Sequence, residues 1–215
     1  MKRVLIIGAN GKVGRILADK LSSSRMSPTA AIRKESQKKY FEQQNIDTRI
    51  ADLEESVESL ADAMTGIDAV VFSAGSGGST GLDKTFSIDL DGAVKSMEAA
   101  KKARVSRYVM VSAIHAGDRN AFQQSPIKSY YIAKYYADRL LMSMKLDYTI
   151  LRPGRLLDKP GSGRITITNP AESRGVPRED VAELARLALI HDNTIGKAIK
   201  FNQGETPIEE IVKSL

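Results

Sequence analysis

Short apolar segments recur along this chain of 215 residues, and a segment with helical spacing follows most of them. The apolar runs are continuous rather than alternating, which is typical of strands that are buried on both faces of a parallel sheet. The pattern predicts strands at 4–7, 29–33, 48–51, 69–74, 108–113 and 148–152. It predicts helices near 12–24, 35–44, 54–64, 88–104 and 127–145, with a further helix starting after Pro177.

This alternation of strands and helices predicts an α/β fold, a doubly wound parallel sheet of the Rossmann type in a single domain covering residues 1–215. In such sheets ligands bind outside the carboxyl ends of the strands. The loops 75–83, 115–126 and 153–176 follow predicted strands and are rich in Gly, Ser, Pro or polar residues. We therefore expect them to form the substrate region.

Composition narrows the function classes. With 42% hydrophobic and 27% charged residues, the chain has the ordinary balance of a globular protein, and no apolar stretch is long enough for a signal peptide or a membrane span. We expect a cytoplasmic protein. The absence of cysteine and the presence of only two histidines make a metal site unexpected. Lysines and arginines give a net charge of +6 but are scattered, which favours attraction of small anions over a nucleic-acid partner.

A glycine-rich loop, GANGKVG, joins the first predicted strand to the first helix and contains Gly8, Gly11 and Gly14. Glycines at this point permit a tight turn and let backbone N–H groups approach a pyrophosphate. The spacing is G-x-x-G-x-x-G rather than the G-x-G-x-x-G of the dinucleotide fingerprint. Its position between a strand and a helix still predicts nucleotide binding.

The end of the second predicted strand indicates which dinucleotide is preferred. Sites for NAD usually carry an acid there, whereas this chain has Arg33 and Lys34. Two cations at this point favour the 2′-phosphate of NADP(H) over NAD(H), although both could simply begin a solvated helix. Asp52, after the third strand, suits either an adenine amino group or the N-cap of the next helix.

Together with Asp52-Leu53, Ser73-Ala74-Gly75 and Tyr130-x-x-x-Lys134, these motifs resemble the short-chain dehydrogenase/reductase superfamily. The chain is most similar to its atypical, compact branch, which contains NmrA-like and biliverdin-reductase-B-like proteins and small bacterial NAD(P)H-binding oxidoreductases. The resemblance implies these cofactor contacts: Gly8, Asn10, Gly11, Lys12, Val13 and Gly14 at the phosphates, Arg33 at the 2′-phosphate, Asp52 and Leu53 at the adenine, Ala74 and Gly75 at the ribose, and Lys134, Pro153 and Gly154 at the nicotinamide side.

Tyr130 and Lys134 lie one helical turn apart, so their side chains share a face. An ammonium group at this distance, together with an oxidised nicotinamide, would lower the pKa of the phenol and make it an acid/base catalyst. The alternative is an aromatic helix that only packs. The superfamily's catalytic serine position falls on Ala113, one residue beyond Ser112, and Ser112 is the candidate that would replace the missing hydroxyl.

We therefore expect an NADP(H)-dependent oxidoreductase that passes hydride to a small carbonyl, quinone, flavin or similar acceptor. Tyr130, Lys134 and Ser112 are its candidate catalytic residues. The alternative is a redox sensor of the NmrA-like kind, which binds the dinucleotide and regulates a partner protein without turnover. The partner expected for the enzyme is a small molecule, and the superfamily resemblance also suggests a homodimer.

Overall fold

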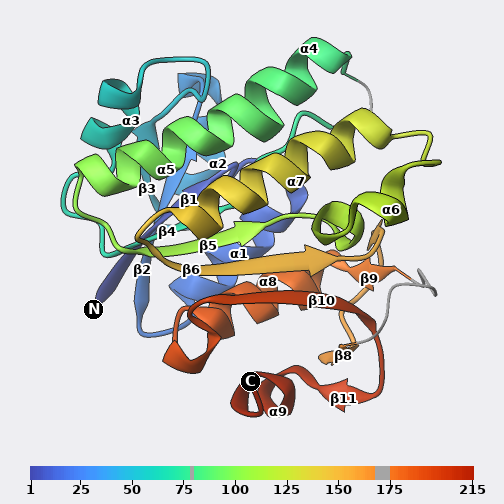
Figure 1. The fold of residues 1–215 in the computed structure, drawn as a ribbon. Helices are drawn as coiled ribbons and strands as arrows, with labels where there is room; N and C mark the ends of the chain where they lie inside the picture. The colour runs from blue at the N-terminus through green and yellow to red at the C-terminus, as the bar shows by residue number, and fades with distance from the viewer. Residues whose placement is uncertain (78–79, 168–174) are drawn as a thin grey trace.

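The computed structural model describes residues 1–77, 80–167 and 175–215. In these ranges a nine-stranded sheet has the order β11-β8-β10-β6-β5-β4-β1-β2-β3 (Figure 1). Its strands are β1 (Lys2–Ile7), β2 (Met26–Ile32), β3 (Asp47–Ile50), β4 (Ala69–Phe72), β5 (Arg107–Val111), β6 (Asp147–Pro153), β8 (Arg164–Thr166), β10 (Lys197–Gln203) and β11 (Thr206–Pro207). The strands from β3 to β10 pair in parallel, whereas β8 is antiparallel to both β10 and β11. A separate parallel pair joins β7 (Leu156–Leu157) to β9 (Val176–Pro177).

Strand β1 lies in the middle of the sheet, between β2 and β4, and Val4 is in register with both Pro28 and Ala69. The chain crosses from β1 to β2 in one direction and then returns to β4 on the other side of β1. Open α/β sheets bind their ligands at this point of reversal, outside the carboxyl ends of the strands. The topology therefore predicts a ligand site at the residues that follow Ile7.

Helices cover both faces of the sheet (Figure 1). They are α1 (Lys12–Ser22), α2 (Lys38–Glu42), α3 (Val57–Ala63), α4 (Leu82–Lys84), the π-helix η2 (Thr85–Gly92), α5 (Ala93–Lys102), α6 (Arg119–Phe122), α7 (Lys128–Ser143), α8 (Arg178–Ala188) and α9 (Ile208–Lys213). Short 3-10 helices are η1 (Glu35–Gln37), η3 (Ile114–Gly117) and η4 (Asp192–Thr194). The segments α4, η2 and α5 follow one another without a break.

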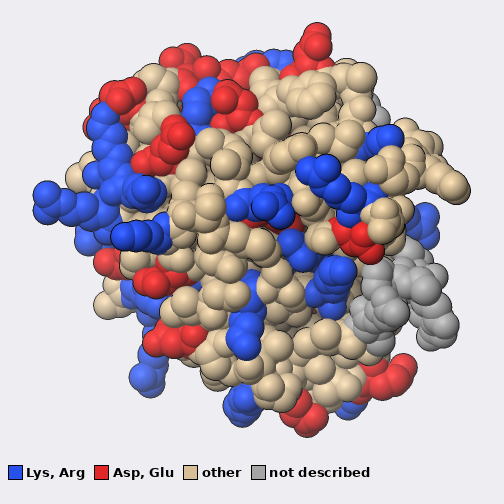
Figure 2. Space-filling model, in the orientation of Figure 1, with Lys and Arg blue, Asp and Glu red and all other residues tan. Residues whose placement is uncertain are grey.

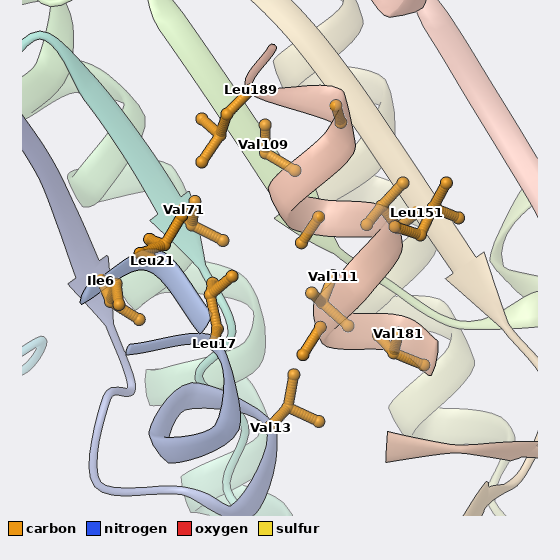
Figure 3. Packing of buried hydrophobic residues seen from close by; sticks show 14 of the residues in the cluster. Ile6, Val13, Leu17, Leu21, Val71, Val109, Val111, Leu151, Val181 and Leu189 are labelled. Carbon is orange, nitrogen blue, oxygen red and sulfur yellow. The ribbon is translucent and has the colours of Figure 1, made fainter. Parts of the chain in front are cut away.

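The two faces of the sheet carry separate cores. Val4 and Ile6 of β1 pack with the cluster beneath α1 and α8, which Figure 3 shows from close by. Leu5 and Ile7 point to the opposite face and pack in the cluster beneath α3, α5 and α7. Burial of consecutive side chains on both faces explains why β1 has a continuous apolar run.

The predicted fold class and the six predicted strands are confirmed. Strand β10, which extends the parallel sheet beyond β6, was not predicted. Two helix starts were misplaced: α3 begins at Val57 rather than near residue 54, and the helical run predicted from residue 88 begins at Leu82. Of the predicted substrate loops, residues 78–79 and 168–174 lie outside the described residues. In the part of the chain that is described, no helix is long and apolar enough to cross a membrane.

Candidate functional site: a groove at the carboxyl ends of the strands

The glycine-rich loop turns directly after β1. Gly8 has a positive φ of 79°, and a side chain on it would come within 2.5 Å of the backbone N of Ala74. A side chain on Gly14 would collide with the carbonyl oxygen of Gly8, so this glycine lets α1 pack closely against the loop. Gly11 is less crowded and borders open space in the groove. Backbone at Gly11 is thus accessible to a ligand's phosphates at the N-terminal end of α1.

A cavity of about 370 Å³ extends from this loop across the ends of β1, β2 and β4. Several of the predicted cofactor contacts line it: Gly8, Asn10, Gly11, Arg33, Leu53, Ala74 and Gly75. Lys34 and Asp52 are not part of its lining. The end of β4 is tied to β1, because the hydroxyl of Ser73 donates to the carbonyl of Ile7 at 3.1 Å. The floor of the cavity is therefore built on the two central strands.

The turn after β2 presents Arg33 to this cavity. The side-chain oxygen of Gln37 accepts hydrogen bonds from the backbone N of Arg33 at 2.9 Å and of Lys34 at 3.3 Å. The second cation at the cavity is Lys84 of α4, which the sequence analysis did not identify. Lys84 pairs with Glu54 at 2.6 Å. Because Glu54 offsets Lys84, the surplus of positive charge at this end of the groove comes from Arg33, and Lys34 directly precedes η1 outside the lining.

Asp52 does not cap the helix that follows it. Its side chain accepts a hydrogen bond from the backbone N of Glu54 at 3.0 Å, which fixes the turn after β3. The cap of α3 is Ser56, whose hydroxyl accepts from the N of Ser59 at 3.2 Å. The helix-cap interpretation of Asp52 was therefore wrong, and its contact with adenine stays a prediction.

A second cavity, of about 540 Å³, shares Gly11, Ser73, Gly75, Ser76 and Thr80 with the first, so the two form one groove. Three further residues of the predicted site line only this second cavity: Lys12, Val13 and Tyr130. Arg33 borders the first cavity of this groove and Tyr130 borders the second.

Beneath Tyr130 lies a buried ion pair. The ammonium of Lys134 is 3.1 Å from the carboxylate of Asp89, and the two side chains are 3% and 0% exposed. The other oxygen of Asp89 accepts from the backbone N of Ser76 at 3.0 Å, and Lys134 also reaches the carbonyl oxygen of Ala74 at 3.5 Å. Asp89 comes from the π-helix η2, a type of helix that occurs frequently at functional sites.

In the protein without cofactor, burial has a larger effect on the pKa of Tyr130 than Lys134 has. Burial raises the pKa of the phenol above its usual 10.0, and Asp89 and Asp138 add to the rise, while Lys134 acts in the opposite direction and is outweighed. Burial alone would lower the pKa of Lys134, but Tyr130, Asp89 and Asp138 together raise it. In the protein without cofactor, Tyr130 is therefore a neutral phenol above a charged lysine, which suits a proton donor better than a base.

The remaining predicted residues lie outside the lining of both cavities, where these are described. Ser112 is buried, and its hydroxyl lies beside the carboxylate of Asp138 without a hydrogen bond of normal geometry. Its catalytic role has no support from this arrangement. Pro153 and Gly154 are buried at the end of β6, and a side chain on Gly154 would collide with Asn202. Their contact with nicotinamide stays a prediction.

The glycine cradle, the groove and the cation at the end of β2 fit a dinucleotide, and they define a Rossmann-type nucleotide-binding protein. The chain belongs to the NAD(P)H-binding family, whose model matches residues 8–192. The resemblance to the atypical short-chain dehydrogenases/reductases is thereby confirmed at the level of family and fold. In the described residues, no group of three or more His, Asp or Glu side chains is placed to hold a metal ion.

Relatives that match nearly the whole chain support this assignment. The uncharacterized sugar epimerase YhfK of Bacillus subtilis is 42% identical over 214 residues, which cover 99% of this chain and 100% of the relative. Among solved structures, a candidate NAD-dependent epimerase/dehydratase from Bacillus halodurans is 38% identical with a TM-score of 0.94 and covers 100% of both chains. The oxidoreductase ylbE from Lactococcus lactis is 34% identical with a TM-score of 0.89, over 99% of this chain and 96% of its own.

Proposed function

We propose that this protein is an NADP(H)-dependent reductase that delivers hydride to a small carbonyl, quinone, flavin or similar acceptor. The observation that carries the proposal is the single groove with cations at one end and a phenol above a buried lysine at the other. A dinucleotide extended along this groove would have its adenosine near Arg33 and its nicotinamide near Tyr130.

The preference for NADP(H) rests on charge at the adenosine end. Arg33 is exposed at the end of β2 and borders the cavity, and Lys84 borders it from α4. The strand β2 offers no acid for a ribose 2′-hydroxyl, because Arg33 and Lys34 follow its last residue, Ile32. A guanidinium group binds phosphate through a pair of parallel hydrogen bonds, which favours the 2′-phosphate.

The chemistry proposed for the other end uses groups of this chain. When bound, NADPH supplies the hydride. Tyr130 gives its phenolic proton to the acceptor oxygen while the acceptor carbon receives the hydride, so that a carbonyl becomes an alcohol. Lys134 stabilises the phenolate that remains until solvent returns a proton, and Asp89 holds the ammonium of Lys134 in position.

Two alternative functions make different predictions. The name of the Bacillus subtilis relative suggests sugar epimerisation, in which a bound cofactor is reduced and reoxidised, so no NADPH is consumed. Ala113, which lacks the hydroxyl of the superfamily's serine, favours a redox sensor that binds NADPH and NADP⁺ with distinct affinities. Continuous NADPH oxidation with an added acceptor supports the reductase and excludes both.

The cofactor preference can be tested with two adjacent substitutions. We expect wild-type protein to bind NADPH at least tenfold more tightly than NADH in calorimetric titrations. Arg33→Ala should remove most of this preference by weakening NADPH binding, because the cation at the end of the groove is lost. Lys34→Ala is the matched control and should change it less than threefold, since Lys34 lies outside the lining.

Three results would contradict this assignment. Equal affinities of wild-type protein for NADPH and NADH would remove the role of the 2′-phosphate. A larger loss in Lys34→Ala than in Arg33→Ala would transfer that role to the neighbour. Failure of all four nicotinamide dinucleotides to bind would overturn the reductase proposal itself.

A further inference from the structure

The second cavity has walls of two kinds beyond the residues assigned to cofactor and proton transfer. One wall is apolar and consists of Leu82, Pro126, Ile127 and Leu156. Leu82 and Ile127 are more than half exposed although they are large hydrophobic side chains. Apolar side chains that border a concave space and remain accessible to water suit the apolar body of a ligand.

The other wall carries a cation, Arg178, the first residue of α8. Its guanidinium donates to the carboxylate of Asp158 at 2.7 Å. The other oxygen of the same carboxylate accepts from the ammonium of Lys12 at 2.7 Å. The side chain of Arg178 is only 22% exposed, whereas that of Asp158 is 60% exposed. Two cations of the cavity thus share one carboxylate that faces solvent.

Counting charges shows a surplus of positive charge at this cavity. Its described lining includes Lys12, Arg178 and Asp89, and Asp89 is neutralised by Lys134. Adding Asp158 gives three cations against two carboxylates, a net charge of +1; when Lys12 binds the cofactor phosphates, Arg178 is left opposite the exposed Asp158.

The acids that follow Arg178 in α8 face elsewhere. Glu179 accepts from the N of Gly161 at 2.9 Å, and Asp180 accepts from the N of Gly163 at 2.8 Å. Both carboxylates thus stabilise the turn before β8, and neither one pairs with Arg178.

From these observations we propose that the acceptor is an amphipathic anion, with an apolar body against Leu82 and Ile127 and an oxyanion group held by Arg178. The carboxylate of Asp158 is the partner of Arg178 that this oxyanion would displace. An arginine fork binds a carboxylate or phosphate through two parallel hydrogen bonds, and an exposed carboxylate is easily displaced. Lys12 is assigned to the phosphates of the cofactor, so Arg178 is the cation left for the acceptor. The inference rests on the proposed function and adds the substrate class.

The test uses a pair of inert ligands of the same shape, 2-naphthoate and 2-naphthamide, titrated by calorimetry into protein saturated with NADP⁺. We expect wild-type protein to bind the anion at least tenfold more tightly than the amide. Arg178→Gln should reduce that ratio to about one, and Arg178→Lys, which keeps the charge without the fork, should give an intermediate ratio. Arg25→Gln is the control, because Arg25 is exposed immediately before β2, at the opposite end of the strand from the groove.

Each other outcome overturns the inference. Equal binding of the two ligands, binding of neither one, or an unchanged ratio in Arg178→Gln would show that no oxyanion site exists at Arg178. A tenfold loss of NADP⁺ affinity in Arg178→Gln would make this residue part of the cofactor site instead. Failure of the proposed function is seen separately, as absence of NADP⁺ and NADPH binding to wild-type protein.

Discussion

Substitution of Tyr130 by phenylalanine is expected to lower kcat for NADPH-dependent reduction by about 100-fold or more, because general acid catalysis typically contributes 10²–10⁴-fold. The phenyl ring retains the shape that borders the cavity, so NADPH affinity should stay within threefold of wild type. Steady-state rates and a calorimetric titration of the same samples measure the two quantities. Tyr131→Phe is the matched control, because the ring of Tyr131 stacks on Phe122 at 6.1 Å and lies outside both cavity linings.

The pH profile provides a second readout for Tyr130. A proton donor must be protonated to act, and burial raises the pKa of this phenol above its usual 10.0. The wild-type kcat for reduction should therefore be level from about pH 6 to pH 9 and fall only at higher pH, where the phenol begins to ionise. A Tyr130→Phe variant that keeps half of the wild-type kcat would remove Tyr130 from the chemistry, and a fall in kcat near pH 7 that persists in this variant would assign the titration to another group.

The parallel core of the fold was predictable because its strands are buried on both faces. Val4 to Ile7 form an unbroken apolar run directly before a glycine-rich turn, and this combination is typical of a buried strand. Strand β10 was missed because its sequence, KAIKFNQ, places lysines between apolar residues, and of these residues only Ile199, Phe201 and Asn202 are buried. Its position next to β6 depends on tertiary pairing, which the local pattern does not encode.

The residues of the candidate site also fall into those that a local sequence pattern predicts and those that only tertiary contacts bring together. Gly8 and Arg33 were found because they occur at fixed points of a strand-turn-helix unit. Lys84, Asp89 and Arg178 were missed because their place depends on segments that meet only in the folded chain. A local signal existed for Asp89: it is an acid at a helical position that falls on the buried face with Thr85 and Ile88. An acid on a buried helical face needs a partner, so this pattern alone could have indicated an ion pair.

The distribution of charged side chains on the surface could not be predicted from the sequence. The face of the molecule in Figure 2 carries lysine and arginine side chains interspersed with acids and uncharged residues. A net charge of +6 spread in this way exerts a weak general attraction on anions, whereas specificity needs a single cation beside an apolar wall. Arg33 and Arg178 border adjoining cavities only because β2 ends and α8 begins at this edge of the sheet.

Substitution of Asp138 by leucine is expected to lower the free energy of unfolding by about 3–5 kcal/mol, because it leaves the buried guanidinium of Arg152 without a counter-charge. Asp138 is 0% exposed, and its carboxylate accepts from Nε of Arg152 at 2.7 Å. The pair links α7 to the end of β6, and Asp138 lies one turn beyond Lys134 on the helix face that carries Tyr130 and Lys134. Urea unfolding followed by far-UV circular dichroism measures the loss.

The double variant Asp138→Leu/Arg152→Met separates the cost of an unpaired charge from a loss of packing. It replaces both partners by apolar side chains, so it should recover most of the stability that Asp138→Leu loses. Glu42→Leu, which removes the exposed pair with Lys38 at 3.5 Å, should leave the free energy of unfolding almost unchanged. If the double variant is no more stable than Asp138→Leu, packing around Asp138 rather than its charge determines the loss. Recovery of stability without recovery of turnover would indicate that Asp138 acts on catalysis as well, through its charge beside Tyr130 and Lys134 or through the alignment of α7.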